Sequence, residues 1–106
     1  MKNIVLTGPM GAGKSSIGRR LAKLLGRTFH DTDQEIRERA GVAIDFIFEK
    51  EGEPGFRQRE EKVLAELLQS ESAVIATGGG VVLSAENRRL MKTRGLVVFL
   101  ETSVDW

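Results

Sequence analysis

The stretch GPMGAGKSS, residues 8–16, follows the apolar run Ile4-Val5-Leu6 and precedes a segment with apolar residues at helical spacing. It satisfies the pattern G-x-x-x-x-G-K-[S/T], and it does so between a strand and a helix, the context that this pattern requires. Glycine lets the backbone approach a ligand closely, and it permits the left-handed conformations that gather successive N–H groups into one concavity. We therefore expect a loop that binds phosphate groups.

Two side chains at the end of this loop carry the expected chemistry. Lys14 would reach the β and γ phosphates of a nucleoside triphosphate, and the Ser15 hydroxyl would bind Mg²⁺. The helix that starts near Lys14 adds unpaired N–H groups and the positive end of its dipole. Kinases, GTPases and mechanical ATPases all use such a loop, so the loop predicts the ligand and leaves the reaction open.

The rest of the chain predicts an α/β fold. Apolar runs without alternation fit strands buried on both faces of a parallel sheet, and they lie at 4–6, 73–76 and 96–100, with 28–30 as a weaker candidate. Helical patterns, most of them followed by glycine, lie at 14–25, 32–40, 44–51, 54–69 and 85–93. Thr32 and Glu35 are spaced as a helix capping box. We expect a single P-loop domain over residues 1–106, with an open parallel sheet, helices on both faces and three layers.

Composition excludes several classes of protein. The 16 basic and 15 acidic residues nearly cancel, which gives no electrostatic case for a nucleic-acid partner or an anionic membrane surface. No apolar run is long enough to span a membrane and no signal peptide is evident, so we expect a cytoplasmic protein. The absence of cysteine and the single histidine, His30, leave the chemistry to carboxylates, Lys, Arg, hydroxyls and backbone.

Two carboxylates follow the weak strand candidate, in the sequence His30-Asp31-Thr32-Asp33. Open α/β sheets bind ligands at the carboxyl ends of their strands, where one carboxylate can serve a metal and the other an acceptor hydroxyl that must lose a proton. Alternatively, Asp33 only favours a helix N-terminus and Asp31 is a solvated turn residue. A GTPase or mechanical ATPase would usually place an Asp after the strand at 73–76; because none is there, Asp31 becomes the candidate for the metal.

Three glycines, Gly78, Gly79 and Gly80, end that strand. They leave an open floor on which a small ligand can lie, with N–H groups that can donate to its oxygens. A flexible turn is the alternative.

Arg57 lies beside the buried stripe of the helix that begins at Pro54. A guanidinium in this position can bind a carboxylate bidentately, and Glu60, three residues on, could hold it in place. A solvated ion pair is the alternative. We interpret Phe46 and Phe48, together with Phe29 and His30, as core or near-core residues.

In combination, GPMGAGKSS, DTD at 31–33, FRQRE at 56–60 and TGGG at 77–80 closely resemble shikimate kinase in order and spacing. The resemblance runs over the whole chain and covers roughly the first three fifths of a family member. It implies a fold like that of the nucleoside monophosphate kinases. It also implies transfer of the γ-phosphoryl group of ATP to the 3-hydroxyl of shikimate, in the pathway to chorismate and the aromatic amino acids, by an enzyme that is a monomer at full length.

The resemblance also implies roles for individual residues. Asp33 would bind the acceptor hydroxyl and act as its base, with Lys14 as the other catalytic residue, and Arg57 would pair with the shikimate carboxylate. Ser15 and Asp31 would hold Mg²⁺. The glycines of the acceptor site would be Gly78, Gly79 and Gly80. The ATP phosphates would lie against Gly11, Ala12, Gly13, Lys14, Ser15 and Ser16.

The chain also departs from the family pattern. Family members continue into a lid whose arginine covers the ATP phosphates, a segment with a second arginine for the shikimate carboxylate, and residues that contact adenine. Without a lid arginine we expect the rate to fall on the order of a thousandfold, so residues 1–106 form a C-terminally incomplete domain with little or no activity of their own. Two alternatives remain: another small-molecule kinase, for gluconate or adenylylsulfate, against which F-R-x-x-E argues, and a non-catalytic ATP-binding module.

Overall fold

The computed structural model describes residues 2–9 and 13–101. Four parallel strands form one sheet in the order β2-β3-β1-β4, namely β1 (Asn3–Thr7), β2 (Phe29–Asp31), β3 (Val74–Ala76) and β4 (Gly95–Phe99). In the central register, Val5 of β1 lies between Ile75 of β3 and Val97 of β4. Because the strands are parallel, their carboxyl ends lie at one edge of the sheet, which confirms the predicted architecture.

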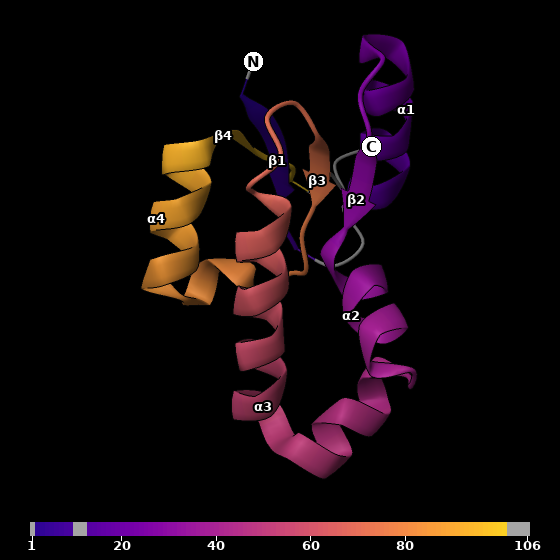
Figure 1. Ribbon diagram of the computed structural model, residues 1–106, viewed down its shortest axis with the longest axis vertical. Helices are drawn as coiled ribbons and strands as arrows, with labels where there is room; N and C mark the ends of the chain where they lie inside the picture. Colours follow the sequence, from indigo (N-terminus) through magenta and orange to yellow (C-terminus); the bar gives the residue numbers. More distant parts are fainter. Residues whose placement is uncertain (1, 10–12, 102–106) are drawn as a thin grey trace.

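Four α-helices and one short 3₁₀ turn connect the strands: α1 (Lys14–Leu25), α2 (Thr32–Ala40), α3 (Ile44–Leu67), α4 (Ala85–Arg94) and η1 (Val81–Leu83). Figure 1 shows α1 on one side of the sheet and α3 with α4 on the other. The three predicted layers are therefore present. Among the described residues, no helix has both the length and the apolar character needed to cross a membrane.

The sheet has a separate apolar core on each face. Leu6 and Val74 pack with Ala22 of α1 on one face. On the other face, Val5 and Ile75 belong to a larger cluster with residues of α3 and α4, namely Phe56, Val63, Leu64, Leu67 and Met91. Neighbouring residues of one strand thus face opposite cores, and this is why the central strands are apolar without alternation. At the sheet's edge, β4 is less covered, with Leu96 and Phe99 58% and 59% exposed.

Helix α3 changes direction at Gly52. The sequence predicts two helices at 44–51 and 54–69, and the structure joins them across Gly52, whose non-helical backbone has φ 73° and ψ 179°. This left-handed φ favours glycine, and Pro54 fits the first turn of the second section, as predicted. The second section returns toward the sheet in Figure 1, and it carries Arg57 and Glu60 to the strands' carboxyl ends.

The predicted cap at the start of α2 is wrong. The side chain that caps α2 is that of Asp31, whose Oδ1 accepts hydrogen bonds from the N–H groups of Asp33 (3.0 Å) and Gln34 (3.2 Å). The capping box predicted from Thr32 does not form, because Thr32 is already helical and its Oγ1 accepts a hydrogen bond from Gly78. Gly95 directly follows α4, as the helical pattern at 85–93 predicts; its backbone is extended, with φ −155°, and it also begins β4.

Candidate active site

Two adjoining cavities open at the carboxyl ends of the strands. The phosphate-loop cavity, of about 430 Å³, is lined by Gly13, Lys14, Ser15, Ser16, Asp31, Asp33, Arg37, Ile44, Thr77, Gly78 and Gly79. The Arg57 cavity, of about 390 Å³, is lined by Pro9, Asp33, Ile44, Phe48, Phe56, Arg57, Glu60, Gly78, Gly79 and Gly80. Asp33 belongs to both linings, as do Ile44, Gly78 and Gly79. The fold therefore brings the residues of all four sequence motifs together around Asp33.

The phosphate loop turns sharply at its first and last described glycines. Gly8 has φ 143°, and a Cβ on it would lie 2.3 Å from the carbonyl oxygen of Leu100, so only glycine fits there. Gly13 has φ 80° and precedes the first turn of α1. Gly11 and Ala12, which the sequence assigns to the ATP phosphates, lie outside the described residues.

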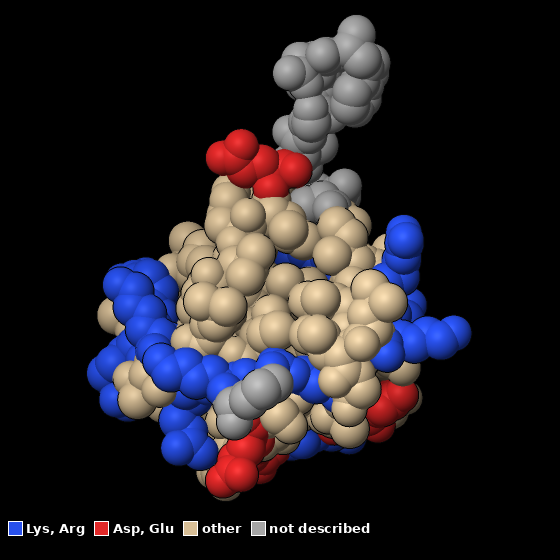
Figure 2. All heavy atoms as spheres, turned by 90° about the horizontal axis from the view of Figure 1, so that it is seen from above, with Lys and Arg blue, Asp and Glu red and all other residues tan. Residues whose placement is uncertain are grey.

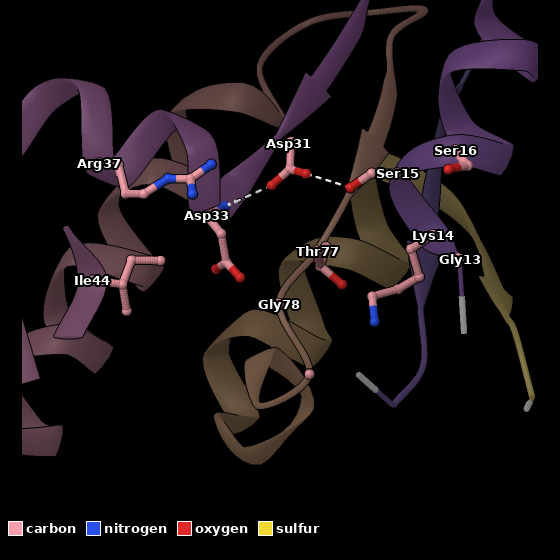
Figure 3. A pocket seen from close by; sticks show the side chains of 11 residues that line it. Gly13, Lys14, Ser15, Ser16, Asp31, Asp33, Arg37, Ile44, Thr77 and Gly78 are labelled. Carbon is pink, nitrogen blue, oxygen red and sulfur yellow. Dashed lines mark hydrogen bonds between the residues drawn. The ribbon is translucent and has the colours of Figure 1, made fainter. Parts of the chain in front are cut away.

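The side chain of Lys14 is bound to the backbone of this loop. Its Nζ donates hydrogen bonds to the carbonyl oxygens of Gly8 (2.7 Å) and Pro9 (2.9 Å). Figure 3 shows its side chain among those that line the phosphate-loop cavity, opposite Asp33. A cation is thus held beside the N-terminus of α1, where an anionic group is favoured.

Ser15 and Asp31 meet at the wall of the same cavity. The Ser15 hydroxyl donates a hydrogen bond of 2.5 Å to Oδ2 of Asp31, while Oδ1 of Asp31 caps α2 (Figure 3). A hydroxyl and a carboxylate oxygen are ligands that suit Mg²⁺, which keeps several waters and takes further oxygens from substrate phosphates. The described residues contain no group of three or more carboxylates or histidines that could hold a metal unaided. The pair therefore fits Mg²⁺ bound with a nucleotide.

Asp33 lies where the two cavities join. Burial raises the pKa of its carboxyl group, and the nearby charge of Asp31 raises it further, while Arg37, Lys14 and Arg57 act in the opposite direction. Its Oδ1 is buried and has no hydrogen-bond partner among the described residues. The result is a carboxylate that is more basic than an ordinary aspartate and has a free acceptor atom.

Arg57 and Glu60 form a buried ion pair in the second cavity. Nη1 of Arg57 donates a 2.9 Å hydrogen bond to Oε1 of Glu60, whose side chain is only 1% exposed. Burial raises the pKa of Glu60, and the hydrogen bond from Arg57 lowers it. Arg57 itself is 28% exposed, which confirms the prediction that it lies at the edge of the buried face with Glu60 beside it. Arg57 Nε and Glu60 Oε2 are buried without partners among the described residues.

The glycine stretch differs from expectation at its first residue. The N–H of Gly78 donates a 3.1 Å hydrogen bond to Oγ1 of Thr32, so this group is already engaged within the protein. Thr77, just before it, donates its hydroxyl proton to the carbonyl oxygen of Leu6 at 2.8 Å. The end of β3 is therefore anchored to β1 and α2 at Thr77 and Gly78, just before the turn at Gly79 and Gly80.

Sequence reasoning missed the apolar wall of the Arg57 cavity. Phe48 stacks on Phe56 with ring centroids 4.6 Å apart, and Ile44 completes this wall. Phe46 and Phe48, predicted as core or near-core residues, are 45% and 36% exposed, and Phe48 reaches the core only at its edge, through the stack on buried Phe56. Phe48 and Phe56 meet because the chain bends between them at Gly52, and no spacing in the sequence indicates that contact.

Comparisons with known proteins agree with this site. The family model for shikimate kinase matches residues 10–106. A shikimate kinase of Actinobacillus pleuropneumoniae is 59% identical over 104 residues, 98% of this chain and 60% of the relative. The structure of shikimate kinase from Acinetobacter baumannii in complex with shikimate superposes with a TM-score of 0.95 at 55% identity, covering 97% of this chain and 57% of that one.

A more distant likeness concerns the fold alone. A gluconokinase from Sinorhizobium meliloti has a TM-score of 0.62 at 22% identity, over 96% of this chain and 58% of that one. The chain spans about three fifths of the length of the curated relatives it matches. With the family model matched over residues 10–106 and 59% identity to a curated relative, the chain belongs to the shikimate kinase family.

Proposed function

We propose that the intact gene product transfers the γ-phosphoryl group of ATP to the 3-hydroxyl of shikimate, for the synthesis of chorismate and the aromatic amino acids. The observation that carries this proposal is the position of Asp33, in the lining of both the phosphate-loop cavity and the Arg57 cavity. A phosphoryl donor in the first cavity and a hydroxyl acceptor in the second would meet at its carboxylate. Phosphoryl transfer depends mainly on such positioning and on stabilisation of charge.

ATP occupies the phosphate-loop cavity in this proposal. Its phosphates lie against the loop from Gly11 to Ser16, and Lys14 exchanges its bonds to the carbonyl oxygens of Gly8 and Pro9 for bonds to the β and γ phosphates. Ser15 and Asp31, already in contact, hold Mg²⁺. The ion, when bound, neutralises charge on the phosphate oxygens.

Shikimate occupies the Arg57 cavity. The guanidinium of Arg57 binds the carboxylate of the substrate, and Glu60 fixes the guanidinium through the 2.9 Å hydrogen bond. The ring lies against Gly79 and Gly80 on one side and the stacked Phe48 and Phe56 on the other. This arrangement directs one hydroxyl toward Asp33.

In the transfer step, the 3-hydroxyl oxygen of shikimate forms a bond to the γ-phosphorus. The bond from that phosphorus to the oxygen bridging it to ADP breaks, and its electron pair leaves with ADP. The hydroxyl proton passes to the carboxylate of Asp33, whose buried Oδ1 has no other partner among the described residues. The raised pKa of Asp33 favours this proton transfer.

The remaining expectations about the intact protein concern its surroundings. We place it in the cytoplasm, as a monomer without a membrane or nucleic-acid partner, and the near-zero net charge of residues 1–106 supports the last point. On the face seen in Figure 2, Lys and Arg form a band from one margin to below a broad uncharged area, with acidic groups above and below that area.

The test is a coupled assay of ADP release by the intact gene product with ATP and Mg²⁺, comparing shikimate, gluconate and adenylylsulfate as acceptors. We expect turnover with shikimate alone, and loss of that turnover when Mg²⁺ is chelated. Turnover with gluconate or adenylylsulfate but not shikimate would overturn the acceptor assignment. Stoichiometric ATP binding without transfer to any acceptor would instead indicate a regulatory module.

A further inference from the structure

Gly80 has no backbone reason to be glycine. Its φ of −94° and ψ of 3° are accessible to residues with a side chain. Gly78 is likewise absent from the glycines with a positive φ. At these two positions, what matters is therefore the space that the absence of a side chain leaves open.

The guanidinium of Arg57 occupies the space where a side chain of Gly80 would lie. A Cβ built on Gly80 would stand 2.4 Å from both Nη atoms of Arg57 and 2.6 Å from its Cζ. Real Cβ atoms essentially never approach a neighbour closer than 3.0 Å. An alanine at position 80 would therefore displace the guanidinium from its place beside Glu60.

Gly78 likewise leaves space that the carboxylates of two other residues occupy. A Cβ on Gly78 would lie 2.8 Å from Oδ1 of Asp33 and 3.1 Å from Oε2 of Glu60. Both oxygens are buried and have no hydrogen-bond partner among the described residues. Both carboxylates thus approach the bare Cα of Gly78 from α2 and α3, while the N–H of Gly78 is held by Thr32.

We propose that Gly80 and Gly78 are positioning residues: by lacking side chains, Gly80 fixes the guanidinium of Arg57 for the acceptor's carboxylate, and Gly78 admits the carboxylates of Asp33 and Glu60 toward the acceptor's hydroxyls. The glycine stretch then acts through side chains of α2 and α3, in addition to lining the cavity with backbone. This inference rests on the proposed function, because it assigns the two glycines to different parts of the same acceptor.

The two positions predict different kinetic signatures in the intact protein. Gly80→Ala disturbs a group that binds the acceptor before and during transfer, so we expect KM for shikimate to rise about 10- to 100-fold with kcat and KM for ATP within about threefold. Gly78→Ala disturbs the base, so we expect kcat to fall about 100-fold or more. Val82→Ala, at a half-exposed position in the adjoining 3₁₀ turn, is the matched control and should change neither constant.

A double-mutant cycle separates positioning from direct contact. Gln at position 57 is too short to fill the space of the guanidinium, so Gly80→Ala should cause no further rise in KM when it is added to Arg57→Gln. If Gly80→Ala fails to fold, the double variant should fold, because the clash is gone. Equal effects of Gly80→Ala in both backgrounds, or a double variant that also fails to fold, would overturn the inference.

A crystal structure of Gly80→Ala gives a readout that does not depend on activity. We expect the guanidinium of Arg57 to have left Glu60, with the backbone of residues 77–80 unchanged. A guanidinium in its original place would contradict the inference even if the variant were inactive. Absence of shikimate-dependent turnover in the wild type would count against the proposed function instead, and the crystal structure would still decide the role of Gly80.

Discussion

The two cavities that meet at Asp33 differ in how their polar groups are satisfied. In the phosphate-loop cavity, Lys14 bonds to two carbonyl oxygens, and Ser15 bonds to Asp31, which also caps α2. In the Arg57 cavity, three polar atoms are buried without partners among the described residues: Asp33 Oδ1, Arg57 Nε and Glu60 Oε2. Lys14, Ser15 and Asp31 are thus paired within the protein, whereas these three atoms, one of them on the residue shared by both cavities, have no partner among the described residues.

This difference determines which hydrogen bonds a ligand would gain on each side. On the phosphate side, the proposed ligand and its metal would exchange the existing hydrogen bonds of Lys14 and Ser15 for new ones. On the acceptor side, each buried polar atom without a partner costs about 1–3 kcal/mol, so a ligand that supplies donors and acceptors recovers that free energy. The acceptor side therefore favours a specific polar ligand at the expense of stability, as active sites commonly do.

The largest effect on the phosphate side is expected from Lys14→Ala in the intact protein. Removing the cation that faces the β and γ phosphates should lower kcat on the order of a hundred- to a thousandfold and weaken ATP binding, because charge developing on the phosphoryl group loses its partner. KM for shikimate should stay nearly unchanged. The coupled assay, with each substrate varied in turn, measures all three constants.

Lys23→Ala is the matched control, since Lys23 lies in the last turn of the same helix, on its exposed side. It should leave both substrates' constants unchanged. A Lys14→Ala variant that raised KM for shikimate while keeping ATP affinity would contradict the division of the site into two sides.

A smaller effect is expected on the acceptor side from Arg57→Lys. The substitution keeps the charge but loses the planar fork that binds a carboxylate bidentately, so KM for shikimate should rise about tenfold while KM for ATP is unchanged. Arg59→Lys is the control on the same helix, because Arg59 pairs with Glu51 on the exposed side. Equal effects of the two variants would show that Arg57 has no special role.

Much of the structure around the two cavities could be predicted from sequence, because it is encoded within short segments. The phosphate loop, the bounds of α1 and α2 and the positions of the strands along the chain follow from glycines, apolar runs and spacing within short segments. The partners of these residues could not be predicted. That Thr32 binds Gly78, and that Gly80 provides space for Arg57, depends on the crossing of segments more than 20 residues apart, which no local pattern encodes. The Asp31 cap was missed for another reason: two adjacent residues, Asp31 and Thr32, could each cap a helix.

The smallest expected effects concern the free energy of unfolding. Burial raises the pKa of Asp33 in the folded protein, so its contribution to stability is fully present below the pKa of the unfolded chain and is lost as pH rises through the folded-state pKa. The stability of Asp33→Asn relative to the wild type should therefore increase as pH rises from about 4 to 7.5. Asp31→Ala, which removes the cap of α2, should instead lose about 1 kcal/mol at neutral pH.

Urea unfolding of the intact protein at several pH values measures both differences. Glu86→Gln serves as the control, because its ion pair with Arg89 is exposed and should contribute little to the free energy of unfolding. If the stability of Asp33→Asn relative to the wild type does not increase between about pH 4 and 7.5, burial of the Asp33 carboxylate carries no electrostatic cost to stability.

The most direct test of the central claim, that Asp33 joins a donor cavity to an acceptor cavity, is a single-turnover measurement on Asp33→Asn in the intact protein. ATP, Mg²⁺ and shikimate are first shown to bind, and the rate of shikimate 3-phosphate formation is then compared with that of the wild type. We predict that ATP binds normally, that shikimate still binds through Arg57, and that the transfer rate falls about 100-fold or more. Transfer at the wild-type rate with both substrates bound would contradict the account.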